Sequence, residues 1–173
     1  MRARPSLFLF AFSTDAFLGT TGNIYRPLQT VSFMIDADIG GNEMFAFHFT
    51  NVLLHAVVCL LLYWFLLIMG YMRINSFVLT LLYAVHPVFA STMAWIPSRG
   101  DQLLTLFALL SILLFVRSIR TNHPAMPYLH GISFLLAFLS KETGVVIPII
   151  CLVIYYQDKS RKATPRILIK YTA

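Results

Sequence analysis

The sequence contains little charge: Asp, Glu, Lys and Arg make up 12% of its 173 residues, whereas 58% are hydrophobic. Soluble domains average about 25% charged residues, so this composition excludes an ordinary soluble fold. The apolar residues are also gathered into runs, some of which reach the ~20 residues that a helix needs to cross a bilayer. The composition therefore predicts an integral membrane protein, with membrane lipid as its first partner.

Cysteine is scarce as well, since Cys59 and Cys151 are the two in the chain and both lie inside apolar runs. No second ligand stands near either of them in the sequence, which disfavours a disulfide or a metal centre. The net charge of +6 is not accompanied by the interleaved basic and aromatic residues that bind nucleic acid. We therefore expect thiols that pack or face lipid, no assigned metal ligands and no nucleic-acid partner.

Long polar stretches are absent between residues 45 and 157, where apolar segments alternate with short polar breaks. Pro87 should kink or break the second apolar segment, because proline removes a helix hydrogen bond. A single helix from 128 to 156 would carry Lys141 and Glu142 to the bilayer centre, which is costly for charged groups. We therefore expect five membrane segments, at residues 45–69, 76–96, 102–116, 128–139 and 145–156.

The expected fold class is all-α: a polytopic transmembrane helical bundle of about five membrane segments plus a short juxtamembrane helix. That helix should cover Tyr25–Ile35, with Pro27 in its first turn, where a missing N–H costs little. Three regions follow from this organisation. They are an outer-face loop with the juxtamembrane helix at 1–44, a transmembrane helical region at 45–157, and a cytoplasmic basic tail at 158–173.

The charges favour one orientation of these segments. If residues 1–44 lie outside, eight of the 13 basic residues fall inside, as the positive-inside rule requires. Six of the seven acidic residues then fall outside. Acidic residues contribute little to orientation, so their position calls for another explanation. Arg2 and Arg4 lie outside in this arrangement and argue against it.

Three basic residues, Arg26, Arg99 and Lys141, stand at membrane boundaries beside carboxylates. A phosphate-bearing lipid needs cations at the height of its headgroup, and a carboxylate can hold a proton or a metal ion. Interfacial snorkelling with local ion pairs explains the same pattern. The residues alone leave both interpretations open.

The histidines and a pair of acids also have two interpretations each. His86, before a helix-breaking proline, either lines a cavity or hydrogen-bonds the carbonyls that the proline frees. His48 and His55 are seven residues apart, which favours interhelical hydrogen bonds over metal ligation. Asp36 and Asp38 precede two glycines, and this favours a solvated loop over a cation site.

Five short segments, taken together and in order, resemble one family. They match its YRPL-x-x-x-SF, N-x-x-L-H-A, LFAVHP, G-R-A-D-L-L and L-S-K-E-x-G segments. The matching residues are Tyr25–Leu28 with Thr30–Phe33, Phe49–Ala56, Leu82–Pro87, Ser98–Leu104 and Leu139–Gly144. The family is that of the TMTC-type protein O-mannosyltransferases of bacteria and eukaryotes, within the GT-C superfamily.

This resemblance implies a membrane glycosyltransferase that takes a sugar, a hexose such as mannose, from a polyprenyl-phosphate donor. The acceptor is a protein or a glycan, and the chemistry takes place on the periplasmic or lumenal face. The compartment is the bacterial inner membrane or the endoplasmic reticulum. An acid of the first outer loop acts as general base and phosphate is the leaving group. Cofactors stay open, with a divalent cation as the candidate.

The resemblance also assigns roles to individual residues. Arg26 and Lys141 match positions expected to bind the donor phosphate, and Asp15 is the candidate catalytic acid. The remaining outer-face residues should support the site, with Arg99 and Asp101 holding helix ends together. These supporting residues are Tyr25, His86, Arg99, Asp101 and Glu142.

One departure from the family pattern concerns the start of the chain. The family begins with a membrane helix followed by an acidic pair, and neither precedes Arg26 here. We therefore expect an incomplete transferase that lacks that helix and its acids. The alternative is a non-catalytic transporter or lipid-binding membrane subunit. Transporters tend to contain repeats and helices broken near the midplane, whereas charges here gather at one boundary, which favours the transferase.

Overall fold

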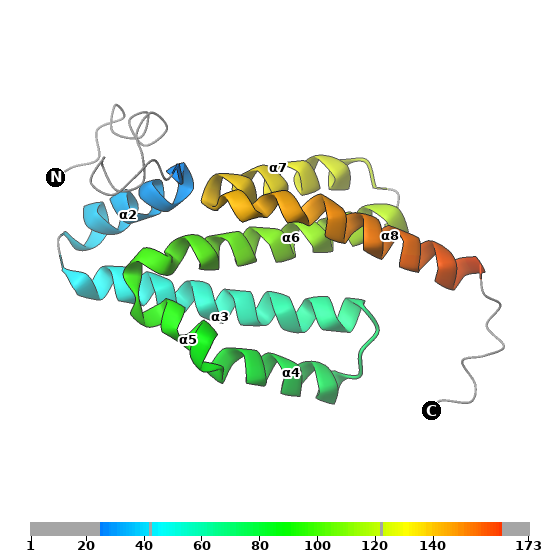
Figure 1. The fold of residues 1–173 in the computed structure, drawn as a ribbon, viewed down its shortest axis with the longest axis horizontal. Coiled ribbons are helices and arrows are strands. Elements are labelled where there is room, and N and C mark those ends of the chain that lie inside the picture. The colour runs from blue at the N-terminus through cyan, green and yellow to red at the C-terminus, as the bar shows by residue number, and fades with distance from the viewer. Residues whose placement is uncertain (1–24, 42, 122, 164–173) are drawn as a thin grey trace.

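The computed structural model describes residues 25–41, 43–121 and 123–163, and every regular element within them is helical (Figure 1). This confirms the all-α class, since no strand occurs in that part of the chain. The α-helices are α2 (Pro27–Gly40), α3 (Met44–Ile68), α4 (Arg73–Val85), α5 (Pro87–Ala94), α6 (Arg99–Thr121), α7 (Ala125–Ser140) and α8 (Ile147–Ala163). Two 3-10 turns, η1 (Ile96–Ser98) and η2 (Glu142–Val146), precede α6 and α8.

The helices run up and down beside one another, with α6 in contact with α2, α3, α5, α7 and α8 (Figure 1). Each long segment reverses the direction of the one before it. The start of α3, the start of α6 and the end of α7 therefore meet at one end of the bundle, next to α2. We name this the charged end, after its residues Arg26, Asp36, Arg99, Asp101, Lys141 and Glu142. The opposite end, which we name the basic end, holds Arg73, Arg117 and Arg120.

Two of the described helices are long and apolar enough to cross a membrane. They are Met44–Ile68, with 25 residues and a mean hydropathy of 2.3, and Ile96–Thr121, with 26 residues and a mean hydropathy of 2.0. A third span results if α4 and α5, which meet at an angle of 54°, are one broken span. The break falls at His86-Pro87, as predicted. The apolar helices α7 and α8 are shorter, so length and composition do not confirm all five predicted segments.

Burial in this bundle runs opposite to that of a soluble protein. Large apolar side chains face outward, among them Leu60 and Ile149. Small and polar residues such as Ser111 and Ser133 are buried between helices, which is typical of helix packing in lipid. The apolar core is small and joins α6, α7 and α8 through Ile112, Val116, Ala137, Ile147 and Cys151. Cys151 is therefore a packing residue, one of the two predicted alternatives.

Several element boundaries differ from the prediction. Helix α2 continues to Gly40, so Asp36 and Asp38 are helical and do not lie in a solvated loop. The expected hinge at 97–101 is instead η1 and the first turn of α6, where Asp101 lies near the positive end of the helix dipole. Helix α6 ends at Thr121, five residues beyond the predicted end. Helix α8 runs to Ala163, into the predicted tail, whose residues 164–173 lie outside the described part of the chain.

Candidate functional site at the charged end

Three ion pairs tie together the elements that meet at the charged end. The Arg26 Nη2 atom lies 3.1 Å from Oε1 of Glu142 and joins the start of α2 to η2. Arg99 pairs with Asp36 and joins α6 to α2. Lys141, which follows α7, pairs with Asp101 in the first turn of α6. The expectation that Arg99 and Asp101 hold helix ends together agrees with this geometry.

Arg99 is the buried centre of this arrangement. Its Nε donates to Asn51 Oδ1 at 2.7 Å, and its Nη2 donates to the Phe47 carbonyl, also at 2.7 Å. Its Nη1 donates to the Asp36 carboxylate, whose other oxygen accepts from the Thr50 hydroxyl at 2.8 Å. A buried charge is tolerated when it is paired and its donors are used, as here. Arg99 therefore fixes α2 onto α3 and α6.

Helix α2 is also held at a second point, Gly100, where it closely approaches α6 and α7. The buried Gln29 side chain of α2 donates from Nε2 to the Pro97 carbonyl at 2.8 Å. A Cβ atom built at Gly100 would lie 2.6 Å from Gln29 Oε1 and 3.3 Å from the Ser140 carbonyl. Only glycine leaves room for α2, α6 and α7 to meet at this point.

The segment after α7 brings the next two site residues back to the bundle. Helix α7 ends at Ser140, and Lys141 continues in extended backbone before η2 begins at Glu142. Lys141 then reaches α6, and Glu142 reaches Arg26 at the start of α2. The predicted break between two apolar segments at Lys141 and Glu142 is confirmed.

The three ion pairs differ in how far a ligand can reach them. The Arg99 and Asp36 side chains are 0% and 7% exposed. Those of Arg26 and Glu142 are 15% and 63% exposed, and those of Lys141 and Asp101 are 22% and 44% exposed. The hydrogen bond from Arg26 lowers the pKa of Glu142, so this carboxylate stays ionised at neutral pH. An anionic ligand can therefore approach Arg26 and Lys141, whereas Arg99 is sealed inside the protein.

Two of the histidines discussed above, His86 and His55, have structural partners in the described residues. His86 precedes α5, and its Nδ1 accepts a hydrogen bond from the Val88 N–H at 3.3 Å, so it caps that helix instead of serving carbonyls freed by Pro87. His55 Nε2 lies 3.2 Å from the Ala84 carbonyl of α4, which confirms an interhelical hydrogen bond. No group of three or more His, Cys, Asp or Glu in the described residues is placed to hold a metal ion.

Most of the predicted site residues come together, and the exceptions are specific. Arg26, Arg99, Asp101, Lys141 and Glu142 meet at the charged end, with the exposed Tyr25 beside Arg26. His86 stands apart at the other end of α5. Asp15 lies outside the described residues.

Three buried residues of the site were missed from the sequence: Gln29, Asp36 and Asn51. The first two share one face of α2 with Ser32, at spacings of three, four and seven residues, which is the pattern of a polar helix face turned inward. That signal requires the helix to continue past Ile35.

The sequence profile of the family described as dolichyl-phosphate-mannose-protein mannosyltransferase matches residues 30–171, and the chain belongs to this family. Within it, the relatives are TMTC-type protein O-mannosyltransferases, which confirms the resemblance found in the motifs. Protein O-mannosyl-transferase TMTC1 of Mus musculus is 37% identical over 145 residues, covering 78% of this chain and 15% of the relative. Protein O-mannosyl-transferase TMTC2 of Homo sapiens is 39% identical over 101 residues, covering 57% of this chain and 12% of the relative.

A relative from an insect, Protein O-mannosyl-transferase Tmtc3 of Drosophila melanogaster, is 29% identical over 158 residues, covering 75% of this chain and 17% of its own. The chain thus spans less than a fifth of the length of these three relatives. No solved structure matches the chain.

Proposed function

We propose that this chain is a membrane-embedded part of a protein O-mannosyltransferase that transfers mannose from a polyprenyl-phosphate donor of the dolichyl type to a protein. The observation that carries the proposal is the charged end. On a bundle with an apolar exterior, it presents two reachable cations, Arg26 and Lys141, at the height where a lipid phosphate would lie. The relatives' names agree with this substrate class.

The two cations suit a phosphate that becomes a leaving group. Arg26 donates from Nε and Nη2 to Glu142, and a guanidinium carries five N–H donors, so a phosphate can bind alongside the carboxylate. Lys141 has three donors and donates one hydrogen bond to Asp101. When the bond between the sugar and the phosphate breaks, negative charge grows on the phosphate oxygens. Fixed cations stabilise that charge in the transition state.

The acceptor hydroxyl must lose a proton during the displacement, and this requires a general base. We propose Asp15, which precedes α2 in the sequence, for this role. The buried Arg99 network fixes the position of α2, and with it the position of Arg26 at the start of that helix. In this mechanism Arg99 is a positioning residue, because it does not reach the surface.

The proposal includes five membrane segments, with the charged end on the periplasmic or lumenal face of the bacterial inner membrane or the endoplasmic reticulum. The segments are α3, the broken pair α4 and α5, α6, α7 and α8. Helix α7 has 16 residues and is about 24 Å long, which is less than the ~30 Å hydrocarbon core. If the other end of α7 lies at the opposite surface, the Lys141-Glu142 segment lies at the membrane surface or a few ångströms below it.

The test is donor binding in the intact protein, with Arg26→Ala, Lys141→Ala and the matched control Arg117→Ala at the basic end. We expect each of the first two to weaken binding of dolichyl-phosphate mannose about tenfold or more, since a charge-assisted hydrogen bond is lost. The control should bind as the parent does. Equal effects of all three substitutions would overturn the phosphate assignment, and donor binding without mannose transfer would favour the lipid-binding alternative.

A further inference from the structure

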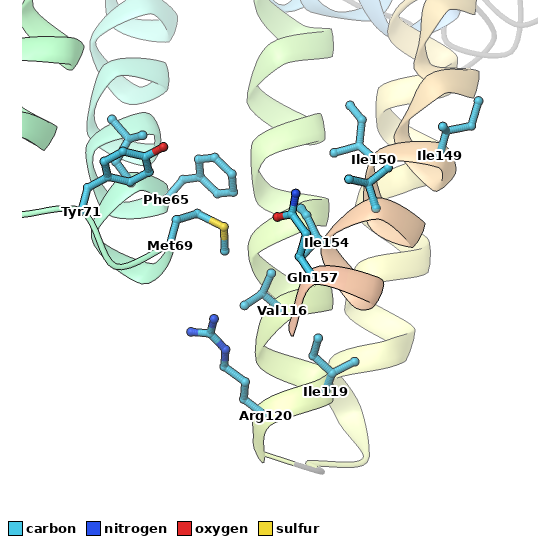
Figure 2. A pocket seen from close by; sticks show the side chains of 12 residues that line it. Phe65, Met69, Tyr71, Val116, Ile119, Arg120, Ile149, Ile150, Ile154 and Gln157 are labelled. Atoms are coloured by element: carbon cyan, nitrogen blue, oxygen red, sulfur yellow. The ribbon is translucent and has the colours of Figure 1, made fainter. Parts of the chain in front are cut away.

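A pocket of about 430 Å³ lies between α3, α6 and α8, on the side of the bundle away from the charged end (Figure 2). None of the charged-end residues lines it. The lining is mostly aliphatic and aromatic, with three polar side chains among the apolar ones. The lining residues are Phe65, Leu66, Met69, Tyr71, Val116, Ile119, Arg120, Ile149, Ile150, Val153, Ile154 and Gln157.

The pocket is elongated along α8. Ile149, Ile150, Val153, Ile154 and Gln157 follow at spacings of one, four, five and eight residues, so they form one helix face that extends for about 12 Å. Of its three polar side chains, Arg120, next to the last residue of α6, lies at the end of the pocket that faces the basic end, whereas Tyr71 and Gln157 lie further along its length (Figure 2). The pocket is therefore a long, mainly apolar groove with a basic residue at its mouth.

Arg120 is the lining residue that carries a positive charge at this mouth. The Arg120 Nη1 atom donates to the Ile68 carbonyl at 3.0 Å, which holds the guanidinium at the end of the groove (Figure 2). Arg117, one turn earlier, lies over the Trp64 ring at 5.7 Å and does not line the groove.

The size of the groove distinguishes between possible occupants. A volume of 430 Å³ lies within the ~300–1,000 Å³ of small-molecule pockets. Two turns of an α-helix with its side chains form a cylinder about 10 Å wide and 11 Å long, or roughly 850 Å³, which the pocket is too small to enclose. An extended hydrocarbon chain fits both the length and the apolar walls. Arg120 at the mouth favours an anionic headgroup on that chain, and anionic lipids are typical of the leaflet that basic residues face.

We propose that this groove binds one acyl chain of an anionic glycerophospholipid, with the lipid phosphate against Arg120. The site is separate from the donor site, because the two lie at opposite ends of the bundle. The proposal does not depend on transferase activity, and its test uses a different ligand and different residues.

The experiment measures phosphatidylserine and phosphatidylcholine bound to the purified chain, by native mass spectrometry after extraction from nanodiscs that contain both lipids. Arg120→Gln removes the phosphate ligand, and Ile154→Trp fills the groove. Arg117→Gln and Leu60→Trp are the matched controls, because both residues are exposed and neither lines the groove. We expect one retained phosphatidylserine, bound about tenfold more weakly by the first two variants and normally by the controls.

A second measurement keeps the proposal testable if Ile154→Trp fails to fold. Phosphatidylserine with a photoreactive group in its acyl chain is cross-linked to the parent chain, and the labelled peptides are mapped. Cross-links concentrated on 149–157 and 116–120 support the groove. Cross-links spread evenly over the outward faces, or equal retention of the two lipids, would show surrounding lipid only and overturn the proposal. In a separate experiment, a photoreactive residue is placed at Val153 in the groove. Cross-links from this residue to a second copy of the chain would also overturn the proposal.

Discussion

The guanidinium of Arg99 joins three helices through hydrogen bonds to four different residues, Asp36, Asn51, Phe47 and Ser32. The face of Phe33 adds a cation–π contact at 4.5 Å. This residue is a connector and cannot serve as a ligand, because its side chain is 0% exposed. Arg26 and Lys141, which make fewer contacts and are partly exposed, are the residues suited to a ligand. This difference in burial assigns the positioning role to Arg99 and the ligand-binding role to Arg26 and Lys141.

Arg99→Ala should destabilise the chain strongly, by about 3–5 kcal/mol, because it leaves the Asp36 carboxylate buried without its partner. Arg99→Lys should recover part of this loss, since it restores the charge without the forked donors. The measurement is unfolding of the purified chain in mixed micelles. Arg117→Ala, at an exposed site, should change the free energy of unfolding by no more than about 0.5 kcal/mol. Similar losses for both alanine variants would contradict the connector role.

At the scale of elements, helix α2 is positioned by its polar face and by the absence of a side chain at Gly100. The pattern of Gln29, Ser32 and Asp36 turns inward because Arg99, Pro97 and the start of α3 supply partners for it. The break between α4 and α5 at Pro87 creates a short helix, α5. Near its end, the Met93 carbonyl accepts a hydrogen bond from Asn51 Nδ2 at 3.5 Å. Local geometry thus prepares the charged end before any ligand binds.

Gly100→Ala should separate α2 from α6 and α7, because the new methyl group would meet Gln29 and the backbone at Ser140. We expect a loss of about 1–3 kcal/mol, the usual range for overpacking, together with weaker donor binding through displacement of Arg26. Gly131→Ala is the control, since nothing lies within 4 Å of a Cβ atom there and alanine favours the helix. The measurements are unfolding in mixed micelles and donor binding. A stable Gly100→Ala variant with normal binding would refute the close-approach argument.

The sequence predicted the positions of the helices better than the ion pairs between them. Apolar runs and prolines placed α3, the kink at Pro87 and the fold back at Lys141 correctly, because these features follow from local chemistry. Helices α2 and α6 extend beyond their predicted ends, because tertiary partners allow charged residues such as Asp36 to continue a helix. The pairing of Arg99 with Asp36 and of Arg26 with Glu142 joins residues far apart in the chain, which spacing along the sequence does not encode.

On the scale of the whole molecule, the two ends differ in charge and in the ligands proposed for them. The charged end combines acids with bases and is neutralised internally by ion pairs, whereas Arg73, Arg117 and Arg120 lie at the other end. By the positive-inside rule, we expect from this asymmetry an orientation with the basic end in the cytoplasm. Both ligand proposals follow this axis: a donor phosphate at one end, and a phospholipid of the opposite leaflet at the other.

This orientation is tested with single cysteines in a chain whose own Cys59 and Cys151 are replaced by alanine. Thr143→Cys places a thiol beside Glu142 at the charged end, and His123→Cys places one in the turn between α6 and α7 at the basic end; both positions are exposed. In sealed vesicles with the native orientation, a membrane-impermeant maleimide should label Thr143→Cys only from the periplasmic or lumenal side. His123→Cys should react from the cytoplasmic side, because an odd number of spans separates the two positions. Labelling of both thiols from one side would contradict α7 as a membrane span, and the reversed pattern would place the charged end in the cytoplasm, away from the donor.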